Sequence, residues 1–203
     1  MSETNLLGNI SEIICTRISH DIIGNVGAVA NAVELLEEGD MDFIDDIRSI
    51  LKVSSRVLSS RLKFFRLAFG LSNSNLTDIT TIKKISADYL QTIGNASFPI
   101  SLDMSISDTS WARPSLLIIM TLADVLVKGG QIEIKEIDGR LAAIVHSSHP
   151  LASEKIKTIK ELISGKIPEN IAQYAPVVYL QKILNNLKKI NIIEDNTFGF
   201  IIQ

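Results

Sequence analysis

The sequence has one cysteine, few aromatic residues and no excess of basic charge, and each shortage excludes a class of protein. Cys15 is the only cysteine among 203 residues, which rules out an internal disulfide framework and a cysteine-based zinc cluster. The 20 Lys and Arg residues against 23 Asp and Glu give a formal net charge of −3, which disfavours binding to DNA or RNA. Aromatic residues make up 5% and hydrophobic residues 46%, so the core must be mainly aliphatic, which suits helix packing and helix-on-sheet packing.

Long apolar runs are also absent. No window approaches the roughly 18 uninterrupted apolar residues that a membrane-spanning helix requires. The first residues, MSETNLLGNISE, lack the basic and apolar regions of a signal peptide. We therefore expect a cytoplasmic protein that does not interact with a membrane.

The first third of the sequence contains the pattern of two long helices. Apolar residues recur at steps of three, four or seven from Ile10 to Leu36, as in one stripe of an amphipathic helix. Gly39-Asp40 ends this helix, and a second helix with a heptad-like apolar seam is predicted from about Met41 to Phe69. Because the connection is very short, the two helices are expected to pair as an antiparallel hairpin.

Two helices with broad apolar faces cannot bury those faces against each other alone. Self-association of two copies into a four-helix bundle is the simplest solution, so we predict a homodimer. The small polar residues of Gly70 to Asn75 predict a linker and a domain boundary. The predicted domains are a helical hairpin over residues 1–72 and a second domain over residues 76–203.

The second domain alternates between helix and strand patterns. Helices are predicted from Thr77-Asp78 to about Ile93, from near Pro114 to Lys128-Gly129-Gly130, near residues 151–164 and near residues 174–189. Strands are predicted at Phe98 to Ile106, at Gln131 to Ile137 and Leu141 to His146 around an Asp138-Gly139 turn, and within Asn191 to Gln203. The expected fold class is α+β, in which an open sheet with helices on one face follows the helical hairpin.

His20 stands out in the first helix because it lies away from the apolar stripe. At about 100° per residue it is roughly 160° from Ile18 and roughly 180° from Val29, so its imidazole is expected to face solvent. The following residue, Asp21, can accept a hydrogen bond from the imidazole and so support a nucleophilic histidine. From these positions alone, an incidental exposed histidine beside a solvated acid is the simpler interpretation.

Small residues surround His20 on the same face of the helix. Gly24 and Gly27 each cost about 1 kcal/mol relative to alanine inside a helix. Close approach of another body is the commonest reason for such glycines, although a kink or tight packing between helices would serve equally well. Ile13 is expected to be exposed on this face, as an apolar residue suited to docking.

Basic residues of the second helix are expected beside His20. Pairing across the hairpin places His20 level with about residues 59–60, and so within about a turn of Arg56, Arg61 and Lys63. Such a basic collar would favour the approach of a phosphoryl group or an acidic partner; the alternative is routine surface charge. The residues predicted to dock a partner are Ile13, Arg17, Gly24, Asn25, Gly27, Arg56 and Lys63.

Other candidate sites are weak. His146 and His149 lie at the end of a predicted strand with no nearby acid or cysteine to complete a metal site. The sequence also contains neither a nucleophile elbow nor a glycine-rich Walker loop. We therefore expect no metal site and no cofactor site in this chain.

The segment around His20 resembles a known family, the ChpT-type histidine phosphotransferases. The resemblance rests on Cys15-Thr16-Arg17-Ile18-Ser19-His20-Asp21-Ile22-Ile23, Val26-Gly27-Ala28-Val29 and Glu34-Leu35-Leu36. It implies a dimeric four-helix bundle followed by an α/β sandwich similar to the ATPase domain of histidine kinases. It also implies that His20 matches the phospho-accepting histidine, Asp21 its acidic neighbour and Arg17 the arginine one turn earlier.

Two residues depart from the pattern of these families. Asn25 replaces the proline that usually stands five residues after the histidine, and Gly24 occupies a position where histidine kinases often have Thr or Asn. These departures put kinase-style dephosphorylation in doubt. The second domain lacks an asparagine in the helix Leu116 to Lys128 and has no Asp-x-Gly-x-Gly motif, so we do not expect it to bind ATP.

The resemblance implies that the chain is a phosphorelay intermediate, which moves a phosphoryl group between the aspartates of receiver domains. The implied partners are the receiver domains of a hybrid histidine kinase and of response regulators of the CtrA type, and the receiver is expected to supply magnesium. Two alternatives remain: an ATP-dependent histidine kinase with degenerate motifs, and a non-catalytic dimeric adaptor in which His20 is incidental.

Overall fold

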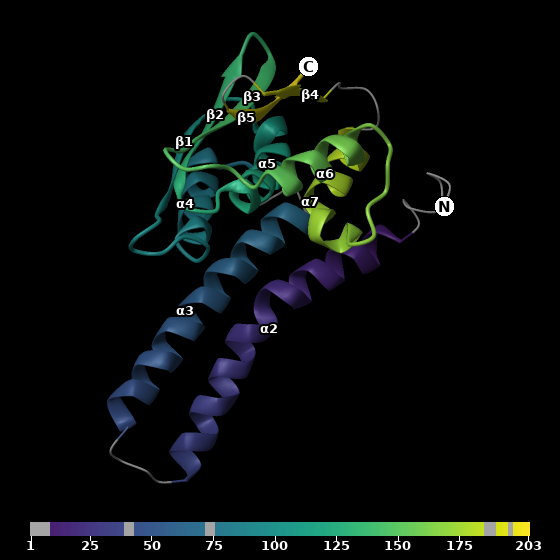
Figure 1. Ribbon diagram of the computed structural model, residues 1–203. Helices are drawn as coiled ribbons and strands as arrows, with labels where there is room; N and C mark the ends of the chain where they lie inside the picture. Colours follow the sequence, from purple (N-terminus) through teal and green to yellow (C-terminus); the bar gives the residue numbers. More distant parts are fainter. Residues whose placement is uncertain (1–8, 39–42, 72–75, 185–189, 195–196) are drawn as a thin grey trace.

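The computed structural model describes residues 9–38, 43–71, 76–184, 190–194 and 197–203. Two long helices, α2 (Ile10–Glu37) and α3 (Ile44–Phe69), run antiparallel and project from a body that is built of a sheet and shorter helices (Figure 1). This arrangement confirms the predicted helical hairpin. The predicted break at Gly39-Asp40, the start of the second helix at Met41 and linker residues 72–75 lie outside the described residues.

The sheet of the body has five strands in the order β1-β2-β3-β5-β4. The first strand is parallel to the second, and the other neighbouring strands are antiparallel. The strands are β1 (Ile100–Ser105), β2 (Gly130–Ile137), β3 (Arg140–His146), β4 (Ile190–Ile193) and β5 (Phe198–Ile202). Buried and less buried residues alternate along β2 and β3, which agrees with the predicted open sheet covered by helices on one face.

The turn between β2 and β3 follows from its sequence. Asp138 and Gly139 both have positive φ angles, of 50° and 71°. Two consecutive positive φ angles characterise the type I′ turn, whose twist matches that of the flanking strands, and Asp-Gly is a preferred sequence for it. The predicted hairpin is therefore confirmed, with its register fixed by pairs such as Ile137 and Arg140.

Helix α5 (Ala112–Val125) lies at the centre of the body. It contacts the sheet as well as α6 (Ser153–Ile163) and α7 (Ala175–Leu184). Its sequence is apolar on all sides, as expected of a helix without a solvent face. All of its residues are buried except Arg113 and Asp124, and it ends three residues before the predicted Lys128.

The hydrophobic core is continuous between the body and the base of the hairpin. Phe64 of α3 stacks on Tyr89 of α4 (Ile79–Leu90), with ring centroids 3.9 Å apart. The N-terminal part of α2 contacts α7 and the short helix η4 (Ile171–Tyr174), and α2 bends part-way along its length before it runs on beside α3 (Figure 1). The division into two domains remains a prediction, since the two parts share this core.

Among the described residues, no helix combines the length and the apolar character needed to span a membrane.

Candidate functional site

His20 lies on the exposed surface of α2. Its side chain is 85% exposed, as the helical periodicity predicted. The imidazole Nδ1 lies 3.3 Å from Oδ1 of Asp21. A carboxylate can only accept a hydrogen bond, so this contact favours the tautomer in which Nδ1 carries the proton. The other ring nitrogen, Nε2, then has a lone pair that is available to an electrophile.

Asp21 is held from two directions by arginines. Nε of Arg17 donates to the second carboxylate oxygen of Asp21, at 2.8 Å. Nη1 of Arg61, on α3, donates to the backbone oxygen of Asp21. The carboxylate and the backbone of the residue beside His20 are therefore fixed independently.

Arg17 is buried rather than available for docking, so its predicted place on an exposed docking surface is wrong. It is 6% exposed, and its Nη1 and Nη2 donate to the two carboxylate oxygens of Asp124 at 2.8 and 3.0 Å. Nη1 also donates to the backbone oxygen of Gln173. Burial alone lowers the pKa of Arg17, but the adjacent carboxylates of Asp124 and Asp21 raise its pKa above the ordinary value. The guanidinium therefore remains charged inside the junction between hairpin and body.

The second arginine, Arg61, joins the hairpin to the end of α4. Its Nε donates to Oγ1 of Thr92 at 3.2 Å, and its Nη2 donates to the backbone oxygen of Thr92 at 3.0 Å. The sequence correctly placed Arg61 near His20. Its seam position points it toward α2, where it reaches the residue after the histidine.

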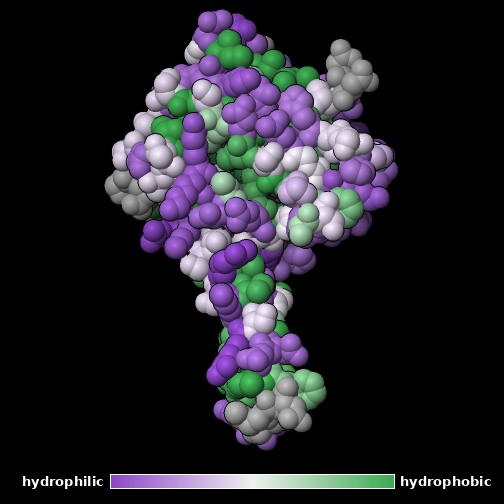
Figure 2. Space-filling view, turned by 90° about the vertical axis from the view of Figure 1, so that its left-hand side faces the viewer, coloured by the Kyte–Doolittle hydropathy of each residue, from purple (hydrophilic) through white to green (hydrophobic). Residues whose placement is uncertain are grey.

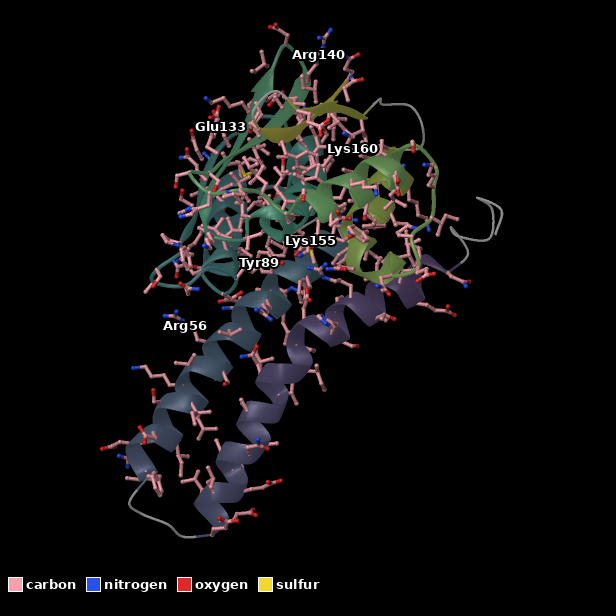
Figure 3. The ribbon with its side chains drawn as sticks, in the orientation of Figure 1. Arg56, Tyr89, Glu133, Arg140, Lys155 and Lys160 are labelled. Atoms are coloured by element: carbon pink, nitrogen blue, oxygen red, sulfur yellow. The ribbon has the colours of Figure 1, made fainter. Side chains whose placement is uncertain are left out.

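The rest of the predicted basic collar is not formed. Arg56 and Lys63 are about 140° and about 160° around α3 from Arg61, so they occupy the opposite side of that helix. Both side chains are exposed, and Arg56 projects away from α2 (Figure 3). Their part in docking a partner stays a prediction, but they do not surround His20 within one chain.

Ile13 is also buried, contrary to the prediction. It is 8% exposed because the segment around Ile167 and Ile171 of the body packs over this part of α2. A groove of about 560 Å³ lies between these elements and is lined by Asn9, Glu12, Ile13, Thr16, Ile167, Pro168, Glu169, Ile171 and Ala172. The apolar surface near His20 is thus a groove shared with the body and not an isolated patch on the helix.

The two glycines near His20 face open space. A Cβ atom added at Gly24 or Gly27 would meet nothing within 4 Å. Tight packing between the two helices of one chain therefore does not explain them. Asn25, between them, is half-buried. Their predicted role in docking is compatible with this open surface and stays a prediction.

Several residues of the junction were missed by the sequence reasoning. Asp124 on α5, Thr92 after α4 and Gln173 on η4 all contact the arginines of the hairpin. Tyr89 is buried in the same junction (Figure 3), and burial, followed by the negative charge of Asp124, raises the pKa of its phenol. The only signal for Asp124 was an acid in the last turn of an otherwise apolar helix, where the helix dipole disfavours it.

No cluster of three or more potential metal ligands occurs in the part of the chain that the structure describes. The expectation that His146 has no acid nearby is wrong, because Oε2 of Glu133 lies 3.1 Å from its Nε2 across the β2–β3 pair. That pair supplies only two ligands, and Glu133 is also bound to Lys135.

Part of the chain is similar in sequence to a known phosphotransferase. Over 85 residues the chain is 40% identical to the protein phosphotransferase ChpT of Brucella abortus (strain 2308), an alignment that covers 41% of this chain and 40% of ChpT. The chain resembles the ChpT phosphotransferases. This similarity confirms the resemblance predicted from the segment around His20, and it supports a phosphotransfer role. The aligned part spans less than half the length of ChpT.

The fold has a counterpart among solved structures. A 1.7 Å structure of a bacterial phosphotransferase matches this chain with a TM-score of 0.74 and 24% identity, over 100% of this chain and 98% of that chain. At this identity the match establishes the shared fold. A histidine kinase from Burkholderia phymatum STM815 matches with a TM-score of 0.38 and 9% identity over the same shares, which is too weak to indicate a common fold. No model of a known protein family matches the chain.

Proposed function

We propose that this protein is a histidine phosphotransferase that carries a phosphoryl group on His20 between the aspartates of receiver domains. The observation that carries the proposal is the exposed imidazole of His20, whose Nδ1 is held by Asp21 while Nε2 is left open to solvent. The similarity to the ChpT phosphotransferases supports the same chemistry.

The proposed reaction follows from this tautomer. The lone pair of Nε2 attacks the phosphorus atom of a receiver phospho-aspartate, an N–P bond forms, and the P–O bond to the aspartate breaks. The aspartate leaves as a free carboxylate, and the ring of His20 becomes positively charged. The carboxylate of Asp21 stabilises that charge through the Nδ1 hydrogen bond. The reverse reaction delivers the phosphoryl group to the aspartate of a second receiver.

The chain itself needs to supply only a nucleophile, its orientation and a docking surface. Magnesium is expected to enter with the receiver, as part of the receiver's own phosphorylation site. The open surface at Gly24 and Gly27 and the groove lined by Ile13 give a receiver two contact regions on either side of His20 along α2. Receivers of a hybrid histidine kinase and of CtrA-type regulators are the proposed partners.

We also propose that two copies pair through their hairpins in a four-helix bundle. Most of the large exposed hydrophobic side chains among the described residues belong to the hairpin, including Ile23 at 65% and Val53 at 55% exposed. Figure 2 shows hydrophobic surface along the projecting hairpin. Apolar helix faces of this extent are normally covered, and a second copy would cover them symmetrically.

Transfer from a labelled receiver tests the proposed function. Receiver domains from the same organism are phosphorylated with labelled phosphate and mixed with the wild-type protein, His20→Ala or His149→Ala. We expect label on the wild type and on His149→Ala, whose exposed histidine packs edge-to-face on Phe98, and none on His20→Ala. Equal transfer to His20→Ala would contradict the proposal.

A second incubation separates the proposal from its alternatives. Labelled ATP without any receiver should leave the protein unlabelled, whereas autophosphorylation of His20 would identify an ATP-dependent histidine kinase. Failure of every receiver to label the wild type would favour the non-catalytic adaptor.

A further inference from the structure

We propose that Asp124 of the body is a positioning residue for His20 and acts on it through Arg17 and Asp21. The inference rests on the proposed function of His20. It adds a residue of the body, Asp124, to the residues that support this function. It gives the body a role in the reaction itself, in addition to any contact that it makes with a partner.

A continuous chain of polar contacts links the two residues. Both carboxylate oxygens of Asp124 accept hydrogen bonds from Arg17, at 2.8 and 3.0 Å. Nε of Arg17 donates to one oxygen of Asp21 at 2.8 Å. The other oxygen of Asp21 lies 3.3 Å from Nδ1 of His20. Each of the four carboxylate oxygens of Asp124 and Asp21 therefore contacts a different nitrogen in this series of contacts.

This division of partners depends on Asp124. The guanidinium of Arg17 is planar and presents its donors in a rigid fork. Asp124 holds the edge of the guanidinium formed by Nη1 and Nη2, and on the neighbouring edge Nε donates to Asp21 while one Asp21 oxygen stays available to His20. Arg17 forms salt bridges with two carboxylates, those of Asp124 and Asp21. If the charge of Asp124 is removed, Asp21 is the one of these two that still carries a negative charge. A bidentate pair between Arg17 and Asp21 then becomes favourable and removes Asp21 from the imidazole.

The location of Asp124 argues for such a role. It is one of only two residues of α5 that are not buried, and it stands in the last turn, where the negative end of the helix dipole opposes a carboxylate. A carboxylate at this position therefore contributes nothing favourable to α5 itself. The hydrogen bonds that its carboxylate accepts in the described part of the chain come from Arg17.

The competing explanation is that Asp124 only fastens the hairpin to the body. Thr92 provides a matched comparison, because it also joins the hairpin to the body through an arginine but does not contact the carboxylate of Asp21. Thr92→Val removes the hydroxyl acceptor of Arg61 with little change in shape. A fastening role predicts similar behaviour for Asp124→Asn and Thr92→Val.

The tautomer of His20 distinguishes the two explanations without any activity measurement. Nitrogen-15 NMR of histidine-labelled protein, recorded at a pH where the ring is neutral, reports which ring nitrogen carries the proton. We expect a protonated Nδ1 in the wild type and in Thr92→Val, and a shift toward protonated Nε2 in Asp124→Asn. Arg17→Lys should shift in the same way, because an ammonium group cannot hold both carboxylates in this geometry.

The rate of phosphoryl transfer from a labelled receiver provides the second readout. Partners that orient a functional histidine typically contribute about 10- to 100-fold, as for metal-binding histidines, and we expect a loss of that size in Asp124→Asn. An unchanged tautomer and rate in folded Asp124→Asn and Arg17→Lys would overturn the inference. If the wild type accepts no phosphoryl group, the proposed function fails, and the NMR comparison alone then decides the role of Asp124.

Discussion

His20 depends on one neighbour for the orientation of its ring, and that neighbour is held by one arginine of the same helix and by one arginine of α3. Asp21 contacts Nδ1 at 3.3 Å, while Arg17 and Arg61 fix its carboxylate and its backbone. An exposed side chain would otherwise rotate among several rotamers. At the scale of single residues, the site therefore consists of a solvent-facing imidazole on a buried ionic support.

The buried support predicts a stability effect at Arg17. Arg17→Met leaves the carboxylates of Asp21 and Asp124 without their shared cation, and we expect the free energy of unfolding to fall by about 3 kcal/mol. Urea unfolding at neutral pH measures the change. Arg48→Met removes an exposed ion pair with Asp45 and should cost less than about 1 kcal/mol. Equal stability of Arg17→Met and the wild type would show that the pair is not a support.

The sequence correctly predicted whether a site residue is exposed or buried where helical periodicity alone decides it. His20 falls into this group, because the opposite face of α2 carries the apolar stripe. Arg17 and Ile13 do not, since the segments that bury them lie more than a hundred residues later in the chain. Asp124 was missed for the same reason, as its partner Arg17 belongs to another element.

At the scale of elements, the glycines of α2 lower the stability of the helix and leave an open surface on which a partner could dock. Gly24 and Gly27 lie inside a helix and face open space. Alanine at either position should therefore raise the free energy of unfolding by about 1 kcal/mol through its higher helix propensity.

The same substitutions should slow phosphoryl transfer if a receiver approaches the helix at these positions. We expect thermal unfolding to move upward while transfer from a labelled receiver slows, with the larger loss in Gly24→Ala/Gly27→Ala. Stabilised variants that transfer at the wild-type rate would show that the glycines do not serve docking.

Strand β2 holds the connection between β1 and η3 (Thr109–Trp111) through one carboxylate. Glu136 accepts hydrogen bonds from the backbone N–H groups of Ser107 and Asp108, at 2.7 and 3.0 Å, and from the hydroxyl of Ser107. The hydrogen bonds from the backbone of Asp108 and then of Ser107 lower the pKa of Glu136 below its ordinary 4.5. Folding therefore favours the ionised form.

A group whose pKa falls on folding stabilises the protein above its unfolded pKa and loses that effect as the pH drops through its folded pKa. We expect Glu136→Gln to unfold at a lower temperature than the wild type at pH 7, and the difference to shrink below pH 4.5. A gap that is constant from pH 7 to pH 3 would contradict the assigned role of the carboxylate.

Elements with local signals were predicted closely, and elements that end through distant contacts were not. The Asp138-Gly139 turn and the cap of α4, where Asp78 accepts a hydrogen bond from the backbone N–H of Thr80, are fixed by adjacent residues. The end of α5 involves a residue that is distant in the sequence, because the backbone oxygen of Val125 accepts a hydrogen bond from the backbone N–H of Ala152. The predicted end of the last helix near residue 189 lies outside the described residues.

At the scale of the whole molecule, the hairpin and the body meet beside His20. The aliphatic core continues across this junction, and the ionic contacts of Arg17 and Arg61 lie within it. The sequence correctly predicted a hairpin and an α+β body. It did not predict that the body packs against the helix one turn before the histidine, at Arg17, because no local pattern encodes a contact between separate elements.

The hairpin predicts the oligomeric state. We expect sedimentation equilibrium at micromolar concentration to give twice the monomer mass for the wild type. Val53→Glu should give a monomer, because a charge on an exposed apolar face of α3 cannot be buried in a bundle. Ser55→Glu, about 160° away around the same helix, should remain dimeric. A monomeric wild type would exclude the proposed bundle.

The most direct measurement of the central claim is the identity of the phosphorylated atom. After exposure of the protein to a phosphorylated receiver, tandem mass spectrometry locates the phosphoryl group, and phosphorus–nitrogen NMR identifies the ring nitrogen that carries it. The orientation imposed by Asp21 predicts phosphohistidine at Nε2 of His20 and no signal in His20→Ala. Phosphorylation at Nδ1 of His20, or at another residue, would contradict it.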